Sequence, residues 1–168
     1  EDSERAAVFA REHKMNVGLH LNYTTPYSKI VSEKLAVSHR RIAKYLLKSK
    51  YRRVVYQPSL KRDFASTYQS QAEEYKRLYG SFPERVDGHH HMHLCANVIV
   101  DRIIPAGTYV RRNHSFFPGE KCILNRVYRK LVDAWLAHTY RCTDYFFSLP
   151  SLDRSEEFDK IERLSRDY

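Results

Sequence analysis

Asp-Gly-His-His-His-Met-His, residues 87–93, is the stretch of sequence from which the fold and the site are best interpreted. It holds four imidazoles and one carboxylate within seven residues, a density that metal sites need and hydrophobic cores do not. If the backbone is extended here, the two-residue period of a strand places alternate side chains on one face. These side chains are Asp87, His89, His91 and His93. The stretch therefore predicts a metal site, in which the carboxylate orients an imidazole or completes the set of ligands. The alternative is an exposed histidine-rich loop that binds metal adventitiously.

Length and composition predict one soluble globular domain. The chain has 168 residues, 42% of them hydrophobic, with 13 Tyr and 8 Phe, which suffices for a hydrophobic core. No apolar run reaches the ~20 residues that a membrane-spanning helix requires, so we expect no membrane partner. We find no targeting segment at the N-terminus.

The net charge of +9 fits either an acidic partner or substrate, or basic residues that only solvate helix surfaces. No recognition module accompanies the charge, so we expect no nucleic-acid partner. Cys95, Cys122 and Cys142 lie far apart and are odd in number, which argues against a disulfide framework and favours a reducing, cytoplasmic location.

The first half of the chain alternates between strand and helix patterns. Ser3 precedes a short apolar run that predicts a helix, with Ser3 as its cap. Residues 15–22 alternate as a strand, with His20 near the C-terminal end. Helical periodicity predicts helices over residues 38–49 and 61–79, the second ending at Gly80. This alternation favours a parallel sheet with the site at the strand ends.

The second half continues the same pattern. Residues 94–104 are almost wholly apolar and predict a buried helix that Pro105 ends. A strand over residues 108–112 would place Arg111 or Arg112 at its C-terminal end. Further predictions are a helix over residues 120–138, a strand over residues 145–147 and a last helix over residues 155–164. The predicted core face of the 120–138 helix consists of Ile123, Leu124, Val127, Leu131, Trp135 and Leu136.

Two motifs stand out: Val-Gly-Leu-His-Leu-Asn at residues 17–22, and the more specific Val-Asp-Gly-His-His-His-Met-His at residues 86–93. Both resemble motifs of the YdjC-like carbohydrate deacetylases. Gln71, Phe82-Pro83 and Val110-Arg111 are also similar to the family. The similarity covers essentially the whole chain.

The resemblance implies a distorted TIM-like (β/α) barrel that removes acetyl groups from N-acetylated oligosaccharides with one divalent metal ion, Mg²⁺ or Zn²⁺. By motif position, His20 and His89 would be the histidine ligands. The family's third ligand is an aspartate in an Asp-Asp-Phe-Gly motif on its first strand, whose aspartate pair is also the expected source of the general base. This sequence contains neither that motif nor the family's C-terminal His-Pro segment. We therefore expect the single domain over residues 1–168 to be incomplete at both ends, lacking the first strand and the C-terminal part.

The remaining assignments concern the site and its activity. Amide hydrolysis needs a nucleophilic water and a stabilised oxyanion, both of which one bound cation supplies. Asp87 is the tentative catalytic residue, although as a neighbour of the ligand it is expected to orient a histidine rather than bind the metal. Arg111 is the tentative substrate-binding residue, with an ordinary surface arginine as the alternative. The second candidate function is a noncatalytic metal- or sugar-binding relative. Too few strands are predicted to close a barrel, so an open sheet edge would favour a homo-oligomer.

Overall fold

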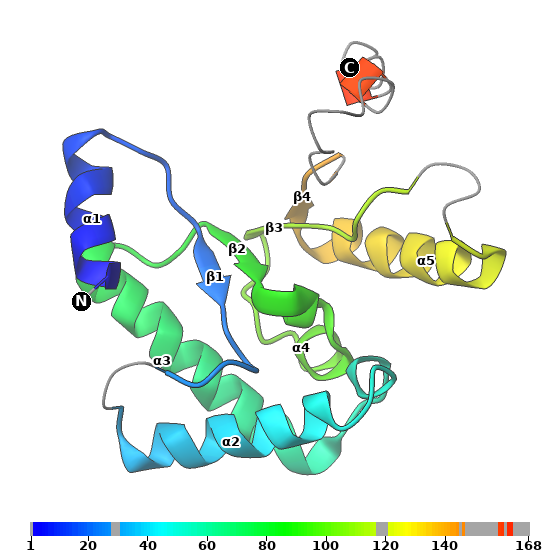
Figure 1. Ribbon diagram of the computed structural model, residues 1–168, viewed down its shortest axis with the longest axis horizontal. Helices are drawn as coiled ribbons and strands as arrows, with labels where there is room; N and C mark the ends of the chain where they lie inside the picture. Colours follow the sequence, from blue (N-terminus) through cyan, green and yellow to red (C-terminus); the bar gives the residue numbers. More distant parts are fainter. Residues whose placement is uncertain are drawn as a thin grey trace.

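A parallel sheet positions the site (Figure 1). The computed structural model describes residues 2–27, 31–116, 121–144, 146, 158–159 and 161–162. Within this part of the chain the sheet has four strands in the order β1-β2-β3-β4, all parallel to their neighbours. The strands are β1 (Leu19–Leu21), β2 (Arg85–Gly88), β3 (Tyr109–Val110) and β4 (Arg141–Cys142). The predicted α/β class with a parallel sheet is thus confirmed.

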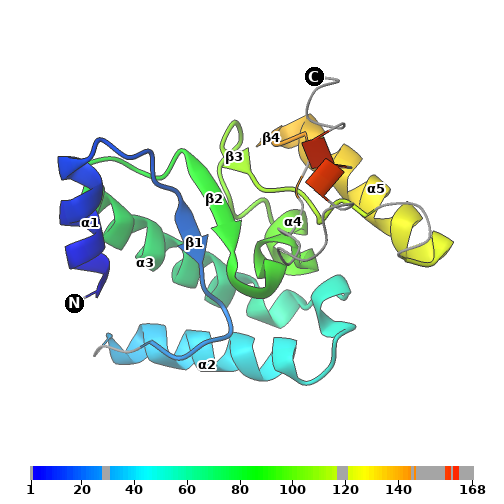
Figure 2. The ribbon, with the colours of Figure 1, turned by 45° about the horizontal axis from the view of Figure 1, so that its top comes forward.

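Helices supply the crossovers that parallel strands require. They are α1 (Asp2–Glu12), α2 (Glu33–Leu47), α3 (Lys61–Tyr79), α4 (Ala96–Val100) and α5 (Ile123–Thr139), with the short 3₁₀-helices η1 (Arg52–Val54), η2 (Pro58–Leu60) and η3 (His89–Leu94). In Figure 2, α3 passes behind β1, and α4 lies to the right of the end of β2. None of the helices in the described ranges is long and apolar enough to cross a membrane.

The helix α3 has the predicted bounds, whereas α2 begins and ends earlier than the predicted range 38–49, at Glu33 and Leu47. In α2, the Ser32 hydroxyl accepts a hydrogen bond from the Leu35 amide at 3.3 Å, and Ile42 and Leu46 are buried. The helix α3 ends at Gly80, whose φ of 87° is the left-handed conformation that glycine adopts without strain. Both helices are amphipathic over at least four turns, which is why their periodicity is legible in the sequence.

The sheet has one buried and one open face. Leu21, Val86 and Val110 are each at most 2% exposed and join the core beneath the sheet. Alternation along the strands turns the intervening side chains the other way. Since His20 is paired in register with Asp87, and Arg85 with Tyr109, these four residues share the open face.

Three predicted elements are shorter in the structure. The predicted strands over 15–22 and 108–112 are limited to Leu19–Leu21 and Tyr109–Val110. The apolar stretch 94–104 forms a helix only at Ala96–Val100, because Cys95 is extended and Arg102 has a left-handed φ of 48°. Apolar composition alone did not reveal these backbone reversals.

The predicted core face of the 120–138 helix is wrong. The helix itself forms as α5, but Ile123, Leu124, Val127 and Leu131 are 76%, 82%, 49% and 66% exposed. Leu136 is the buried residue of α5, and Trp135 packs partly against the core. Figure 1 shows the reason, because only the C-terminal end of α5 meets the sheet while the rest extends away from it.

The chain after β4 was predicted less well. A strand occurs at Arg141–Cys142, ahead of the predicted strand over 145–147, of which residues 145 and 147 lie outside the described residues. Most of the predicted helix over 155–164 also lies outside them, although residues 158–159 and 161–162 are helical.

Cys95, Cys122 and Cys142 are free thiols. Among the described strands, β1 and β4 are sheet edges, so closure into a barrel stays a prediction.

Candidate functional site

Asp87 is the centre of a small polar cluster at the carboxyl ends of three strands. Its Oδ1 lies 2.7 Å from Nδ1 of His20 on β1, and its Oδ2 lies 2.7 Å from Nη1 of Arg111, which directly follows β3. An ionised carboxylate only accepts hydrogen bonds, so Nδ1 of His20 carries the proton. In the neutral ring, Nε2 then carries the free lone pair. This is the tautomer in which a histidine binds a metal ion through Nε2 while its Nδ1–H is held by a carboxylate.

The second histidine of the predicted pair lies beside the first. The rings of His20 and His89 have centroids 5.8 Å apart and meet edge to face at 81°. The pKa of His89 is lowered from its ordinary value by desolvation, and then by the neighbouring His90 and His20. His89 therefore remains neutral at physiological pH, which is the form that binds metal.

The prediction that residues 87–93 run extended is wrong. The strand ends at Gly88, and His89–Leu94 forms tight 3₁₀ turns in which His90 and His91 have left-handed φ values of 51° and 58°. Alternation therefore does not place His91 and His93 beside His89. Instead, the His91 ring lies 5.7 Å from the Phe146 ring, and burial is the main cause that lowers the pKa of His91 to about 4.

His93 is a structural residue beneath the site. It is 1% exposed, and its Nε2 donates a hydrogen bond to the Arg111 carbonyl at 2.8 Å. Burial lowers its pKa to about 4, with the hydrogen bond to the Arg111 carbonyl opposing the shift. The side chain and amide of His93 pack so closely on Gly88 that a Cβ there would lie 2.9 Å from both. This contact fixes the turn that carries His89.

Gln71 holds the backbone just after β1, the strand that carries His20. Its Nε2 donates to the Asn22 carbonyl at 2.9 Å, and its Oε1 accepts from the Asn22 amide at 2.8 Å. The Asn22 side chain in turn accepts from the amides of Thr24 and Thr25. Both backbone polar groups of Asn22, the residue that follows β1, are thereby hydrogen-bonded to α3. Only the family resemblance singled out Gln71, because such a bond between distant segments leaves no periodic signal.

A pocket of about 440 Å³ runs along the open face of the sheet next to this cluster. Residues that line it include His20, Arg85, Asp87, Tyr109, Arg111 and Phe146. The Arg111 guanidinium also lies 4.5 Å from the centre of the Phe146 ring and donates to the Gly88 carbonyl at 3.1 Å. Arg111 thus belongs to the polar cluster and lines the pocket, and its role in substrate binding stays a prediction. Sequence reasoning missed Arg85 and Tyr109, although alternation from Asp87 and Arg111 pointed to both.

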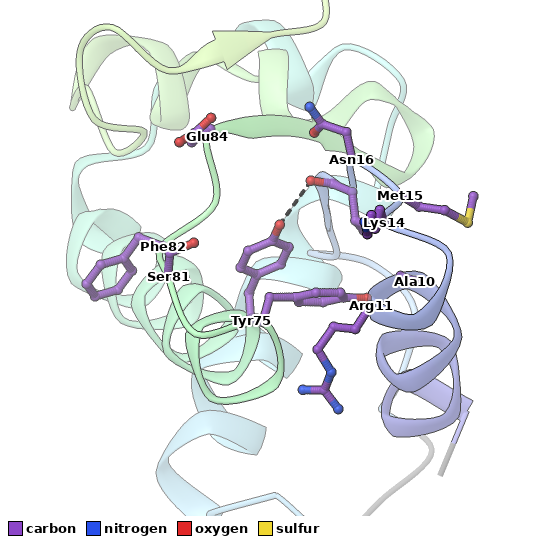
Figure 3. A pocket seen from close by; sticks show the side chains of 11 residues that line it. Ala10, Arg11, Lys14, Met15, Asn16, Tyr75, Ser81, Phe82 and Glu84 are labelled. Carbon is purple, nitrogen blue, oxygen red and sulfur yellow. Dashed lines mark hydrogen bonds between the residues drawn. The ribbon is translucent and has the colours of Figure 1, made fainter.

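A second pocket, of about 340 Å³, lies at the opposite end of the strands between α1 and α3 (Figure 3). There the Tyr75 hydroxyl donates to the Val17 carbonyl at 2.9 Å, and the Arg11 guanidinium donates to the Leu78 carbonyl at 2.7 Å. These bonds fasten α1 and the approach to β1 onto α3. We therefore locate the candidate site in the first pocket.

The donor set fits a divalent cation in part. His20 and His89 offer two neighbouring imidazoles, while both oxygens of Asp87 are already engaged by His20 and Arg111. Within the described ranges, no three or more His, Cys, Asp or Glu side chains are grouped so that they could hold a metal ion. These residues thus supply two ligand positions and one orienting carboxylate.

Fold and site together define a parallel α/β protein with a histidine–aspartate cluster at the strand ends, where such folds hold their ligands. The family model described as YdjC-like protein matches residues 1–167, so the chain belongs to the YdjC-like family. This is a family of carbohydrate deacetylases related to polysaccharide deacetylases. No curated protein and no solved structure matches the chain.

Proposed function

We propose that the cluster is the site of a metal-dependent hydrolase that removes acetyl groups from N-acetylated oligosaccharides. The observation that carries this proposal is the arrangement of His20, whose Nδ1 is held by Asp87 at 2.7 Å, beside the edge of the His89 ring. A carboxylate that fixes the tautomer of one of two adjacent imidazoles is the usual surrounding of a histidine metal ligand. Family membership supplies the reaction class.

His20 and His89 would hold one divalent ion, Mg²⁺ or Zn²⁺. When bound, such an ion polarises an acetyl carbonyl and lowers the pKa of a water molecule. Imidazole ligands favour Zn²⁺, whereas Mg²⁺ prefers oxygen ligands. The ligands of this chain therefore favour Zn²⁺ unless further oxygen ligands contribute.

The protein's own residues would orient the substrate. Arg111 offers a planar set of donors to acetyl and hydroxyl oxygens, and the rings of Tyr109 and Phe146 line the same pocket. Asp87 is a poor candidate for the general base, because His20 and Arg111 occupy both of its oxygens. We assign Asp87 a positioning role instead. The four-stranded sheet would belong to a TIM-like barrel, with the pocket on the inner face.

A noncatalytic metal- or sugar-binding relative is the second candidate function. It is favoured by the lack of a group of three or more metal-ligating side chains in the described part of the chain. General-base assistance typically contributes about 10²–10⁴-fold. Under the first proposal we therefore expect slow acetate release from this chain, and under the second none.

The test compares the wild-type chain with H20A/H89A and with the control H138A, which removes an exposed histidine at the end of α5. Zn²⁺ per chain is measured after dialysis, followed by acetate release from N-acetylglucosamine oligosaccharides with Zn²⁺, Mg²⁺ or Mn²⁺. We expect the double variant to lose the bound Zn²⁺ and the control to retain it. Equal metal content in all three proteins would refute the histidine pair. Metal binding without any acetate release would favour the noncatalytic relative.

A further inference from the structure

A second layer of side chains crosses the open face of the sheet beside the histidine–aspartate cluster. Strand register places Arg85 opposite Tyr109, and Tyr109 opposite Arg141. These three residues, which we call the arginine–tyrosine row, lie one pleat away from the layer of His20, Asp87 and Arg111 on the same face. Arg85 and Tyr109 also line the pocket that contains His20 and Asp87.

The side chains of the row are held in place by ring contacts. The Arg85 guanidinium carbon lies 5.2 Å from the centre of the Tyr109 ring, and that of Arg141 lies 4.0 Å from it. The two guanidiniums come from the strands that flank β3, so both positive charges are drawn to one ring. Stacking restrains the guanidinium planes and leaves their N–H edges available to a ligand.

The charge of the two layers differs. In the first layer the Asp87 carboxylate balances the Arg111 guanidinium at 2.7 Å. In the row, neither Arg85 nor Arg141 lies within ion-pair distance of a carboxylate of the described residues, and both are exposed. The positive charges of Arg85 and Arg141, which both lie against the Tyr109 ring, therefore have no carboxylate beside them among the described residues. An anion in the pocket would supply the counter-charge.

We propose that the arginine–tyrosine row recognises a carboxylate on the sugar, so that the preferred ligand is an acidic N-acetylated oligosaccharide, such as one containing a uronic acid. This inference rests on the proposed function, because the N-acetylated residue would occupy the neighbouring layer of His20 and Asp87. A planar carboxylate matches the fork of a guanidinium in a bidentate pair. The Tyr109 ring gives the sugar an apolar surface in the same pocket.

The test measures the affinity of the 168-residue chain for two tetrasaccharides of equal length. One contains only N-acetylglucosamine, and the other alternates N-acetylglucosamine with glucuronic acid. The quantity of interest is the ratio of the two dissociation constants. We expect the wild-type chain to bind the acidic sugar about tenfold more tightly at low salt, and this preference to weaken with added NaCl.

Variants assign the preference to the row. In R85Q/R141Q the ratio should fall to near one, whereas R5Q/R62Q, which removes two exposed arginines elsewhere, should keep the wild-type ratio. R85K/R141K keeps the charge without the planar fork and should retain part of the preference. A wild-type ratio near one, or an equal ratio in wild type and R85Q/R141Q, would overturn the inference.

The outcome separates this inference from the proposed function. Acetate release without a preference for the acidic sugar leaves the deacetylase proposal standing and refutes the arginine–tyrosine row. Arginine-dependent preference without acetate release supports the row and refutes the deacetylase activity of this chain.

Discussion

Two polar residues far apart in the sequence place His20. Asp87 fixes its ring through the contact to Nδ1, and Gln71 fixes its backbone through both polar groups of Asn22. If a buried or half-buried amide loses its hydrogen-bond partner, the loss in stability exceeds the net contribution of that hydrogen bond, because water cannot reach the unpaired group. Small displacements of this segment would separate His20 from His89. The position of the proposed metal-binding pair thus depends on Asp87 and Gln71, to which we assign no role as metal ligands.

Substitution of Gln71 tests this dependence. In Q71L both hydrogen bonds to Asn22 are lost, so we expect the free energy of unfolding to fall by about 1–3 kcal/mol and the bound Zn²⁺ per chain to decrease. The control is Q69L on the exposed side of the same helix, where only a surface contact to Glu73 is lost. Urea denaturation and metal analysis of both variants provide the readout. Equal unfolding free energies for Q71L and Q69L would contradict the role of Gln71.

At the scale of elements, long periodic segments were predictable and short ones were not. The bounds of α3 agree with the sequence pattern because nineteen residues repeat one amphipathic stripe. The turn η3 was missed because its conformation is set by tertiary packing, with His93 buried against Gly88. The family motifs indicated His20, His89 and Arg111, and the structure brings all three together at the carboxyl ends of the strands. The two-residue period places Arg85 and Tyr109 on the face of Asp87 and Arg111, whereas their position opposite each other depends on strand register, which the sequence does not encode locally.

The contact between β2 and η3 gives a prediction at this scale. In G88A the new methyl group would lie 2.9 Å from the Cβ and amide of His93, so the turn must shift. We expect a loss of about 1–3 kcal/mol in unfolding free energy, typical of overpacking. At Gly18 a Cβ would lie 3.1 Å from the Cβ and carbonyl of Arg85, so G18A should cost less. Thermal denaturation of both variants checks the order, and a G88A variant as stable as wild type would disprove it.

At the scale of the whole molecule, α5 packs against the core mainly through its C-terminal part. Its N-terminal half exposes an apolar stripe of Ile123, Leu124, Val127 and Leu131, while its C-terminal end reaches the core through Leu136. A contiguous exposed stripe of this kind is a common site of association. The sheet adds to this, because β1 and β4 are its edges among the described strands. We therefore propose that copies of this chain associate through α5.

Charge placed in the stripe should prevent that association without unfolding the chain. The side chains of Leu124 and Leu131 are mostly exposed, so L124E and L131E should change the unfolding free energy by less than about 0.5 kcal/mol. Both should lower the concentration-dependent increase in mass seen by analytical ultracentrifugation, because a glutamate at a buried interface must lose its water. The control A65E adds the same charge at an exposed position of α3 and should associate as the wild type does. A monomeric wild-type chain, or equal association of L124E and A65E, would show that the stripe of α5 has no such role.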